Sequence, residues 1–245
     1  MTAAAKSRGI ADQLIRISRQ HAAAVDQLAF QSPVAYVYNP LNYAAPLHEA
    51  YLRRFGGQPG RMLLLGMNPG PWGMAQTGVP FGEVSSVRDW MKLSGEVRTP
   101  RKSHPKRPID GLSCPRSEVS GKRLWGWAAD QFGTADAFFE FHFVLNYCPL
   151  MFLLESGANL TPDKLTVPER AALTAVCDDA LRQYCDALSP KMVIGVGGFA
   201  ARRAEIALAG TGIRIGQVLH PSPASPAANR GWAAEMTRQM RDLTK

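Results

Sequence analysis

The chain has 245 residues, of which 46% are hydrophobic and 20% are charged, so it can bury a sizeable core in one domain. It has no run of about 18 apolar residues and no apolar leader like that of a secretory signal, so we expect neither a membrane span nor export. Its 28 Lys and Arg residues outnumber its 20 Asp and Glu residues, which favours a polyanionic partner such as nucleic acid.

Helices and short buried strands alternate along the chain. Apolar residues at helical spacing predict an N-terminal helix over residues 5–29, and residues 31–46 look extended or irregular. Further helices are predicted at residues 46–55, 83–93, 118–132, 168–188, 197–208 and 227–243. Apolar runs bounded by glycine or turn residues predict buried strands at residues 61–66, 139–145, 192–196 and 213–219.

This alternation of strands and helices is typical of a parallel sheet that is covered on both faces. We therefore predict an α/β fold, a three-layer α/β/α sandwich with a central, mostly parallel four-stranded sheet. The sequence shows no internal repeat and no convincing linker, which favours a single domain over residues 1–245, with the helix of residues 1–29 packed on it.

Polar loops follow three of the predicted strands. Their sequences are GMNPGPWG at residues 66–73, NYCP at residues 146–149 and HPSP at residues 220–223. Ligands of parallel α/β sheets collect at the carboxyl ends of the strands. We therefore expect the three loops to meet and to form the functional site.

Asn68 is the first candidate for chemistry, because it follows a strand and precedes Pro69, which holds its backbone extended. Gly66 and Gly70 let the backbone or a ligand approach closely. An Asn held in this way can orient a water molecule through its amide oxygen. An ordinary turn explains the same residues equally well.

Three more residues are candidates for binding a base. Asn146 offers a donor and an acceptor that complement the O4 and N3–H edge of uracil better than cytosine, or it satisfies backbone groups in a turn. His220 can donate to a developing anion, or it is an ordinary loop histidine. Phe81, next to Gly82, can stack on a flipped base, or it belongs to the core.

A basic segment, RTPRKSHPKR at residues 98–107, contains two prolines that exclude a regular helix. It is either a DNA-backbone contact that includes Arg101 and Lys102 or a solvated loop.

The glycines of residues 195–200 resemble a dinucleotide fingerprint without its acidic partner, and their backbone amides could instead hold a DNA phosphate. The four cysteines lack C-x-x-C spacing, so we expect reduced structural thiols and neither a metal nor a cofactor.

Three long motifs identify a family resemblance. They are GMNPGPWGMAQTGVPFGEV at residues 66–84, FVLNYCPLMFL at residues 143–153 and HPSPASPAANRGW at residues 220–232. Their order, spacing and content resemble the single-strand-selective monofunctional uracil-DNA glycosylases, and the likeness extends from about residue 30 to the last helix. The resemblance implies a uracil-DNA glycosylase fold that acts on DNA in base excision repair.

The family's roles carry over to matching positions of this chain. Asn68 matches the residue that positions the hydrolytic water, His220 the one that stabilises charge on uracil O2, and Asn146 the one that reads the uracil edge. Phe81 matches the stacking ring, and Gly66, Met67 and Gly70 belong to the same substrate-binding segment. The loop that penetrates the duplex matches Ser222, Pro223, Ala224, Ser225 and Arg230.

The resemblance also implies the products and the range of substrates. No lysine in the matched motifs can form an imine, so we expect an abasic site without strand cleavage. Substrates could extend to 5-hydroxymethyluracil, xanthine or hypoxanthine. We expect a monomer, cytoplasmic in a bacterium or nuclear in a eukaryote, without a membrane partner.

Two departures from the animal members stand out. Trp72 replaces a Phe, and Ala224 replaces an Arg in the duplex-penetrating loop, which puts the grip on double-stranded DNA in doubt. Arg230 or the basic segment could compensate. The alternatives are a mismatch-specific uracil/thymine-DNA glycosylase and a non-catalytic DNA-binding module of the same fold.

Overall fold

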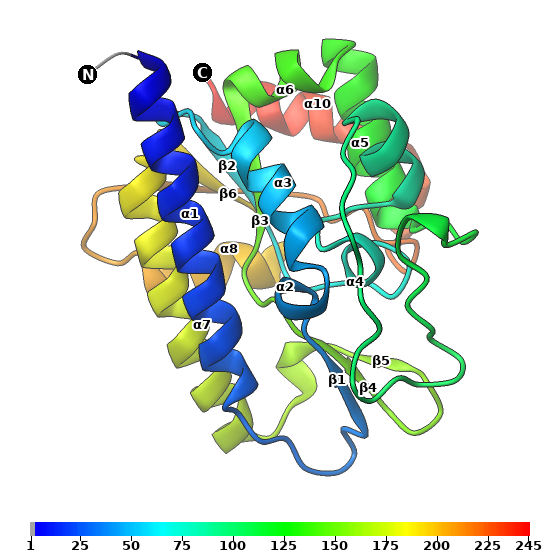
Figure 1. Cartoon of the computed structure of the whole chain (residues 1–245). Helices are drawn as coiled ribbons and strands as arrows, with labels where there is room; N and C mark the ends of the chain where they lie inside the picture. Colours follow the sequence, from blue (N-terminus) through cyan, green and yellow to red (C-terminus); the bar gives the residue numbers. More distant parts are fainter. Residues whose placement is uncertain (1–2) are drawn as a thin grey trace.

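The computed structural model describes residues 3–245, so the first two residues of the predicted domain lie outside the described part. Its central feature is a parallel sheet with the strand order β3-β2-β6-β7 (Figure 1). The strands are β2 (Met62–Gly66), β3 (His142–Asn146), β6 (Met192–Val196) and β7 (Arg214–Val218). In β2 and β3, Gly66 pairs with Asn146, so these two strands end side by side.

Helices flank this sheet in two groups (Figure 1). α7 packs against α1 and α8, while α5 packs against α6 and α10. The long helices are α1 (Ala3–Asp26), α3 (Ala45–Phe55), α5 (Val119–Phe132), α6 (Ala135–Phe141), α7 (Val167–Leu188), α8 (Gly198–Ala207) and α10 (Trp232–Leu243). The predicted α/β/α architecture with four parallel strands is confirmed.

A second, antiparallel sheet was not predicted. Its strands are β1 (Tyr36–Tyr38), β4 (Met151–Leu153) and β5 (Asn159–Leu160), in the order β1-β4-β5. Each has only two or three residues, too few for an alternating pattern to appear. It lies at the bottom of Figure 1, beyond the ends of β2 and β3.

Short helical turns interrupt segments that the sequence analysis treated as loop or as one helix. They are α2 (Pro40–Tyr43), α4 (Met74–Thr77), α9 (Pro226–Asn229), a π-helical turn (Ser86–Trp90) and two 3-10 turns (Gly111–Ser113 and Pro162–Lys164). The predicted helix at residues 227–243 is broken at Gly231, whose φ of 125° no helix accommodates.

The predicted boundary of the second strand was also wrong. Residues 139–141 belong to α6, and β3 begins only at His142. Thr134 caps α6 by accepting a hydrogen bond from the backbone N–H of Ala137 at 3.2 Å. A short apolar run fits a helix or a strand equally well, and here the cap decides for the helix.

All four cysteines are buried and free, so the prediction of reduced structural thiols is confirmed. Among residues 3–245, no group of three or more His, Cys, Asp and Glu side chains is arranged to hold a metal ion. In the same range, no helix has the length and apolar character that crossing a membrane requires.

Candidate active site

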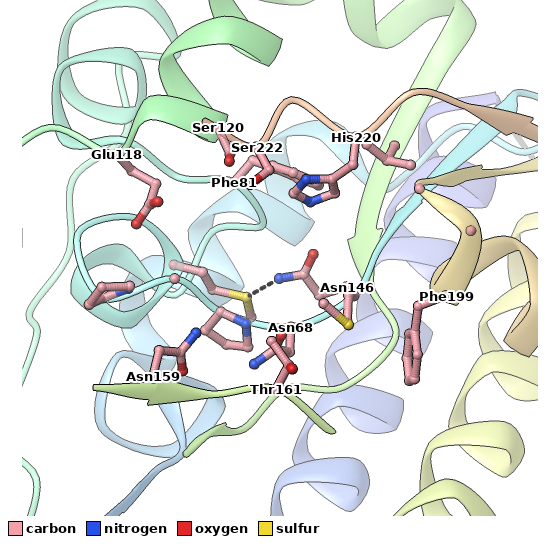
Figure 2. Close-up of a pocket in the computed structure, with 18 residues that line it drawn as sticks. Asn68, Phe81, Glu118, Ser120, Asn146, Asn159, Thr161, Phe199, His220 and Ser222 are labelled. Carbon is pink, nitrogen blue, oxygen red and sulfur yellow. Dashed lines mark hydrogen bonds between the residues drawn. The ribbon is translucent and has the colours of Figure 1, made fainter. Parts of the chain in front are cut away.

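A cavity of about 400 Å³ lies at the carboxyl edge of the parallel sheet. Asn68, Phe81, Asn146 and His220 all line it, although they come from three separate regions of the chain (Figure 2). Met67 and Gly70 line it as well, and Gly66 lies directly behind Asn146 and Phe81. The expected meeting of the three strand-end loops is therefore present in the structure.

The amide of Asn68 is held in one orientation. Its Nδ2 donates a hydrogen bond to the backbone oxygen of Leu150 at 3.2 Å. The backbone N–H of Cys148 donates to the oxygen of Met67 at 2.8 Å, so the loop after β2 is bonded to the segment after β3. With Nδ2 engaged, Oδ1 of Asn68 remains as an acceptor for a ligand or a water molecule.

Asn146 is placed by the strand pairing and by a glycine. A Cβ atom at Gly66 would lie 2.2 Å from Asn146 Oδ1 and 2.6 Å from Phe81 Cε2, so only glycine lets both side chains occupy these positions. Nδ2 of Asn146 donates to Sδ of Met74 at 3.1 Å, drawn as the dashed line in Figure 2. A thioether is a weak acceptor, so a carbonyl oxygen can replace it at small cost.

Phe81 has a backbone conformation that L-residues rarely adopt, with φ of 53°. Its carbonyl oxygen accepts hydrogen bonds from Trp125 Nε1 at 3.0 Å and from the backbone N–H of Glu83 at 2.7 Å. These bonds hold a conformation that costs about 1–3 kcal/mol. The side chain is only 9% exposed and presents its ring to the cavity.

His220 faces the cavity across from Asn68 and Asn146 (Figure 2). Its ring centre is 6.2 Å from that of Phe81. A Cβ at Gly197, where φ is 96°, would lie 3.0 Å from His220 Cβ. Burial of the imidazole lowers its pKa to about 4, so the ring is neutral at physiological pH. A neutral imidazole still carries one N–H that can donate to an oxygen atom.

Comparisons with known proteins identify the family. The model of the uracil DNA glycosylase superfamily matches residues 54–243. The single-strand selective monofunctional uracil DNA glycosylase of Bos taurus is 50% identical over 219 residues, which are 89% of this chain and 80% of that protein. The namesake from Mus musculus is 46% identical over 239 residues, 97% of this chain and 86% of that protein.

The chain belongs to the uracil DNA glycosylase superfamily. Within it, the chain is a member of the single-strand selective monofunctional uracil DNA glycosylases, as the three motifs predicted. A crystal structure of wild-type SMUG2 from Pedobacter heparinus shares the fold, with a TM-score of 0.69, 18% identity, and coverage of 96% of this chain and 97% of that one.

Glu118 is a cavity residue that the sequence analysis missed. Its Oε2 accepts a hydrogen bond from the backbone N–H of Trp72 at 3.0 Å. The same oxygen occupies the space that a side chain at Gly70 would fill, 2.5 Å from the position of the absent Cβ. Burial raises the pKa of this carboxyl group. Glu118 thus holds the loop that carries the glycosylase motif and also lines the cavity.

Arg123 was missed as well, and it anchors the loop after His220. Its Nη1 donates to the backbone oxygens of Pro221 at 3.1 Å and Ser222 at 3.4 Å, and its Nη2 donates to Asn229 Oδ1 at 2.8 Å. No sequence signal marks it, because it lies in an ordinary amphipathic helix. Its contacts fix the entry to the loop that the family resemblance assigns to DNA.

That loop projects from the body of the protein. Ser222 lines the cavity, while Pro223, Ala224 and Arg230 are exposed. Ser225 caps α9 by accepting from the N–H of Ala228 at 3.4 Å. The loop is therefore hydrogen-bonded at its base and exposed at Pro223 and Ala224, and its insertion into DNA stays a prediction.

The basic residues Arg101 and Lys102 do not reach the cavity. They line a separate hollow with Asp26, and this hollow shares no lining residue with the catalytic cavity. Nζ of Lys102 donates to the backbone oxygen of Ala35 at 2.8 Å and lies 4.5 Å from the centre of the Tyr36 ring. Contact between these two residues and DNA remains a prediction.

Proposed function

We propose that this glycosylase hydrolyses the N-glycosidic bond of a uracil nucleotide that is extruded from DNA into the cavity. The observation that supports this most strongly is that Asn68, Asn146 and His220 line one cavity of about 400 Å³, although they follow three different strands. A site that acts on a base must take it out of the stack, and a pocket of this kind receives the extruded nucleotide.

Base recognition falls to Asn146 and Phe81. Oδ1 of Asn146 accepts from uracil N3–H, while Nδ2 leaves the sulfur of Met74 and donates to O4. Cytosine has no proton at N3 and presents an amino group in place of O4, so both bonds are lost. The Phe81 ring stacks on the base, and Met67, Gly66 and Gly70 keep the backbone close to it.

The bond breaks dissociatively, with positive charge on the deoxyribose and negative charge on the departing base. His220, which is neutral because its imidazole is buried, donates to uracil O2 as this charge develops. Oδ1 of Asn68, left free by the bond from Nδ2 to Leu150, orients the water that attacks the sugar. A neutral amide does not remove a proton from water, and the electrophilic sugar makes a stronger base unnecessary.

The product is an abasic site in an uncut strand. None of the residues that line the cavity in the described chain is a lysine, so no amine is placed to form an imine with the sugar. The relatives are named monofunctional, which agrees with this assignment. No step needs a cofactor or a metal ion.

DNA is held at the rim of the cavity. Ser222, Pro223, Ala224 and Ser225 enter the duplex, and Arg230 contacts the phosphates from the exposed side of the loop. Arg101 and Lys102 add a second, more distant contact to the backbone. We place the enzyme, as a monomer, in the cytoplasm of a bacterium or the nucleus of a eukaryote.

The test is incubation with oligonucleotides that carry one uracil, single-stranded or paired with A or G, followed by alkali to cut at abasic sites. We expect alkali-dependent cleavage at uracil in every strand context and none before alkali. Release of thymine from a G·T pair at a comparable rate would favour the mismatch-specific alternative. Complete absence of abasic sites would overturn the proposal. The same assay with 5-hydroxymethyluracil, xanthine and hypoxanthine defines the range of bases.

A further inference from the structure

Two arginine side chains lie over the indole ring of Trp72, just beyond the loop that carries Asn68. The guanidinium carbon of Arg116 is 4.5 Å from the ring centre, and that of Arg107 is 5.3 Å away. The face of an aromatic ring carries partial negative charge, so each contact is favourable. We call these three residues the Arg107–Trp72–Arg116 cluster. The mechanism given above makes no use of it.

The two positive charges of this cluster are not neutralised. Within residues 3–245, neither guanidinium forms an ion pair with a carboxylate. Nη1 of Arg107 donates to the backbone oxygen of Lys106 at 2.8 Å. The carboxyl group of Glu118 is bonded to the backbone of Trp72 and is not paired with either cation. The guanidinium groups of Arg107 and Arg116 both lie over the Trp72 ring, and an anion that bound both of them would reduce the repulsion between their positive charges.

The cluster lies beside the mouth of the catalytic cavity. Trp72 is four residues after Asn68 and directly follows Pro71, which lines the cavity. Four residues of extended chain span at most about 14 Å, so the backbone of Trp72 lies within that distance of Asn68. Arg116 is exposed, while Arg107 and Trp72 are half-buried, so a strand leaving the cavity can reach the cluster.

The arrangement suits a phosphate better than a base. The guanidinium groups lie over the ring where a nucleobase would stack, so the ring is occupied. The N–H groups of Arg116 form no hydrogen bond within the described residues, which leaves them available to a ligand. The forked donors of arginine match the oxygens of a phosphodiester and bind them in pairs.

We propose that the Arg107–Trp72–Arg116 cluster binds a phosphodiester of the substrate strand next to the extruded nucleotide. The choice of strand rests on the proposed function, whereas the affinity for phosphate rests on the cluster itself. Ala224 carries no charge and is exposed in the loop after His220, so the cluster adds a cationic contact that this residue cannot make.

The test is the salt dependence of binding to a uracil-free, single-stranded oligonucleotide, measured by fluorescence anisotropy. Each phosphate contact contributes a slope of about 0.7 to the plot of log Kd against log salt concentration on single strands. The double variant Arg107→Gln/Arg116→Gln removes both cations from that one phosphate, so it should lower the slope by about 0.7 and raise Kd about tenfold at moderate salt. Arg116→Gln alone, which changes an exposed side chain, should give about half of the slope change.

The matched control is Arg8→Gln/Arg241→Gln, which removes the same charge from exposed positions in α1 and α10. Arg8 lies near the start of α1 and Arg241 near the end of α10. Those two helix ends lie at the top of Figure 1, and α4 lies lower in the view. Wild-type slopes in this control and reduced slopes in the cluster variants support the proposal. Slopes that are equal in the cluster and control variants overturn it. Because the oligonucleotide lacks uracil, this outcome is independent of whether the enzyme excises uracil.

Discussion

The wall of the catalytic cavity and the rim around it are built differently. In the wall, side chains interlock: Asn146 and Phe81 fill the space left by Gly66, and Asn68 is bonded to the segment after β3. At the rim, Ala224, Arg230 and Arg116 are exposed. The wall holds the reacting groups in position, and the rim supplies positive charge.

This difference predicts which substitutions should slow the chemical step and which should weaken DNA binding. A change in the wall alters the position of a reacting group, and small displacements there are costly to the chemical step. A change at the rim removes one of several screened charges, and the others continue to hold the DNA. The following predictions range from the largest expected effect in the wall to the smallest at the rim.

Asn68→Ala should have the largest effect. Loss of the amide oxygen leaves the attacking water without a fixed position, and we expect single-turnover excision of uracil to slow by about 10³-fold. The Kd for uracil-containing DNA should stay within about twofold of the wild-type value, because the rim is intact. Near-normal excision by this variant would assign the water to another group.

His220→Ala should slow excision by about 10²-fold, because one donor to the developing anion is lost. The wild-type rate should show no inflection between pH 5 and pH 8, since the pKa of His220 is lowered to about 4 and the ring stays neutral. The lowered pKa also makes the free energy of unfolding depend on pH. Because the unfolded chain takes up a proton at this histidine near pH 6.5 and the folded protein does so only near pH 4, the contribution of His220 to stability is complete above pH 6.5 and is lost as the pH falls toward 4. An inflection near pH 6.5 that disappears in the variant would contradict the neutral imidazole.

Asn146→Asp should reduce kcat/KM on uracil by about 10- to 100-fold. A carboxylate accepts from N3–H but cannot donate to O4, and one lost base contact of this kind is worth about 1–3 kcal/mol. Competition between uracil and cytosine oligonucleotides measures the effect, and an unchanged preference for uracil would remove Asn146 from base recognition.

Glu118→Ala should lower the stability by about 1–3 kcal/mol and slow excision about tenfold. The substitution leaves the Trp72 N–H without its acceptor and opens space beside Gly70. Glu118→Gln keeps an acceptor oxygen and the volume, so it should recover most of both losses. Urea unfolding and single-turnover rates test the pair of variants, and equal behaviour of Ala and Gln would show that the hydrogen bond is unimportant.

Charge reversal at Arg101 and Lys102 should have the smallest effect. Both residues are exposed and line a hollow apart from the catalytic cavity, so we expect Kd for any DNA sequence to rise only a few-fold, about 2- to 5-fold. The effect should vanish at high salt, where surface charges are screened. A loss of affinity as large as that of the Arg107→Gln/Arg116→Gln variant would make this hollow a main DNA contact.

The sequence predicted the wall better than the rim. Asn68, Asn146 and His220 could be located because each lies at or just after the end of a predicted strand, and parallel strands end at one edge of the sheet. Glu118 could not, because it acts on the backbone of Trp72, 46 residues away, and no local pattern reports such a contact. The unpredicted second sheet has the same explanation, since its short strands depend on pairing between distant segments.

The residues at the rim were harder to predict from the sequence, because a run of basic residues does not show which of them lies near the cavity. The segment of residues 98–107 was correctly predicted as an irregular loop, and Arg101 and Lys102 were selected as its DNA contacts. In the folded protein it is Arg107, at the other end of the same segment, that comes to lie over Trp72 beside the cavity. Only the path of the loop in space distinguishes these cations.

The missing side chain at Gly66 limits how this enzyme could be redesigned for other bases. Any larger residue there would displace both the ring of Phe81 and the amide of Asn146. Directed evolution toward bulkier lesions would therefore fail at that strand end. Room for them would have to come from beside Gly70, where the side chain of Glu118, at the N-cap of α5, could be replaced by a shorter one, with the losses of stability and rate expected for Glu118→Ala.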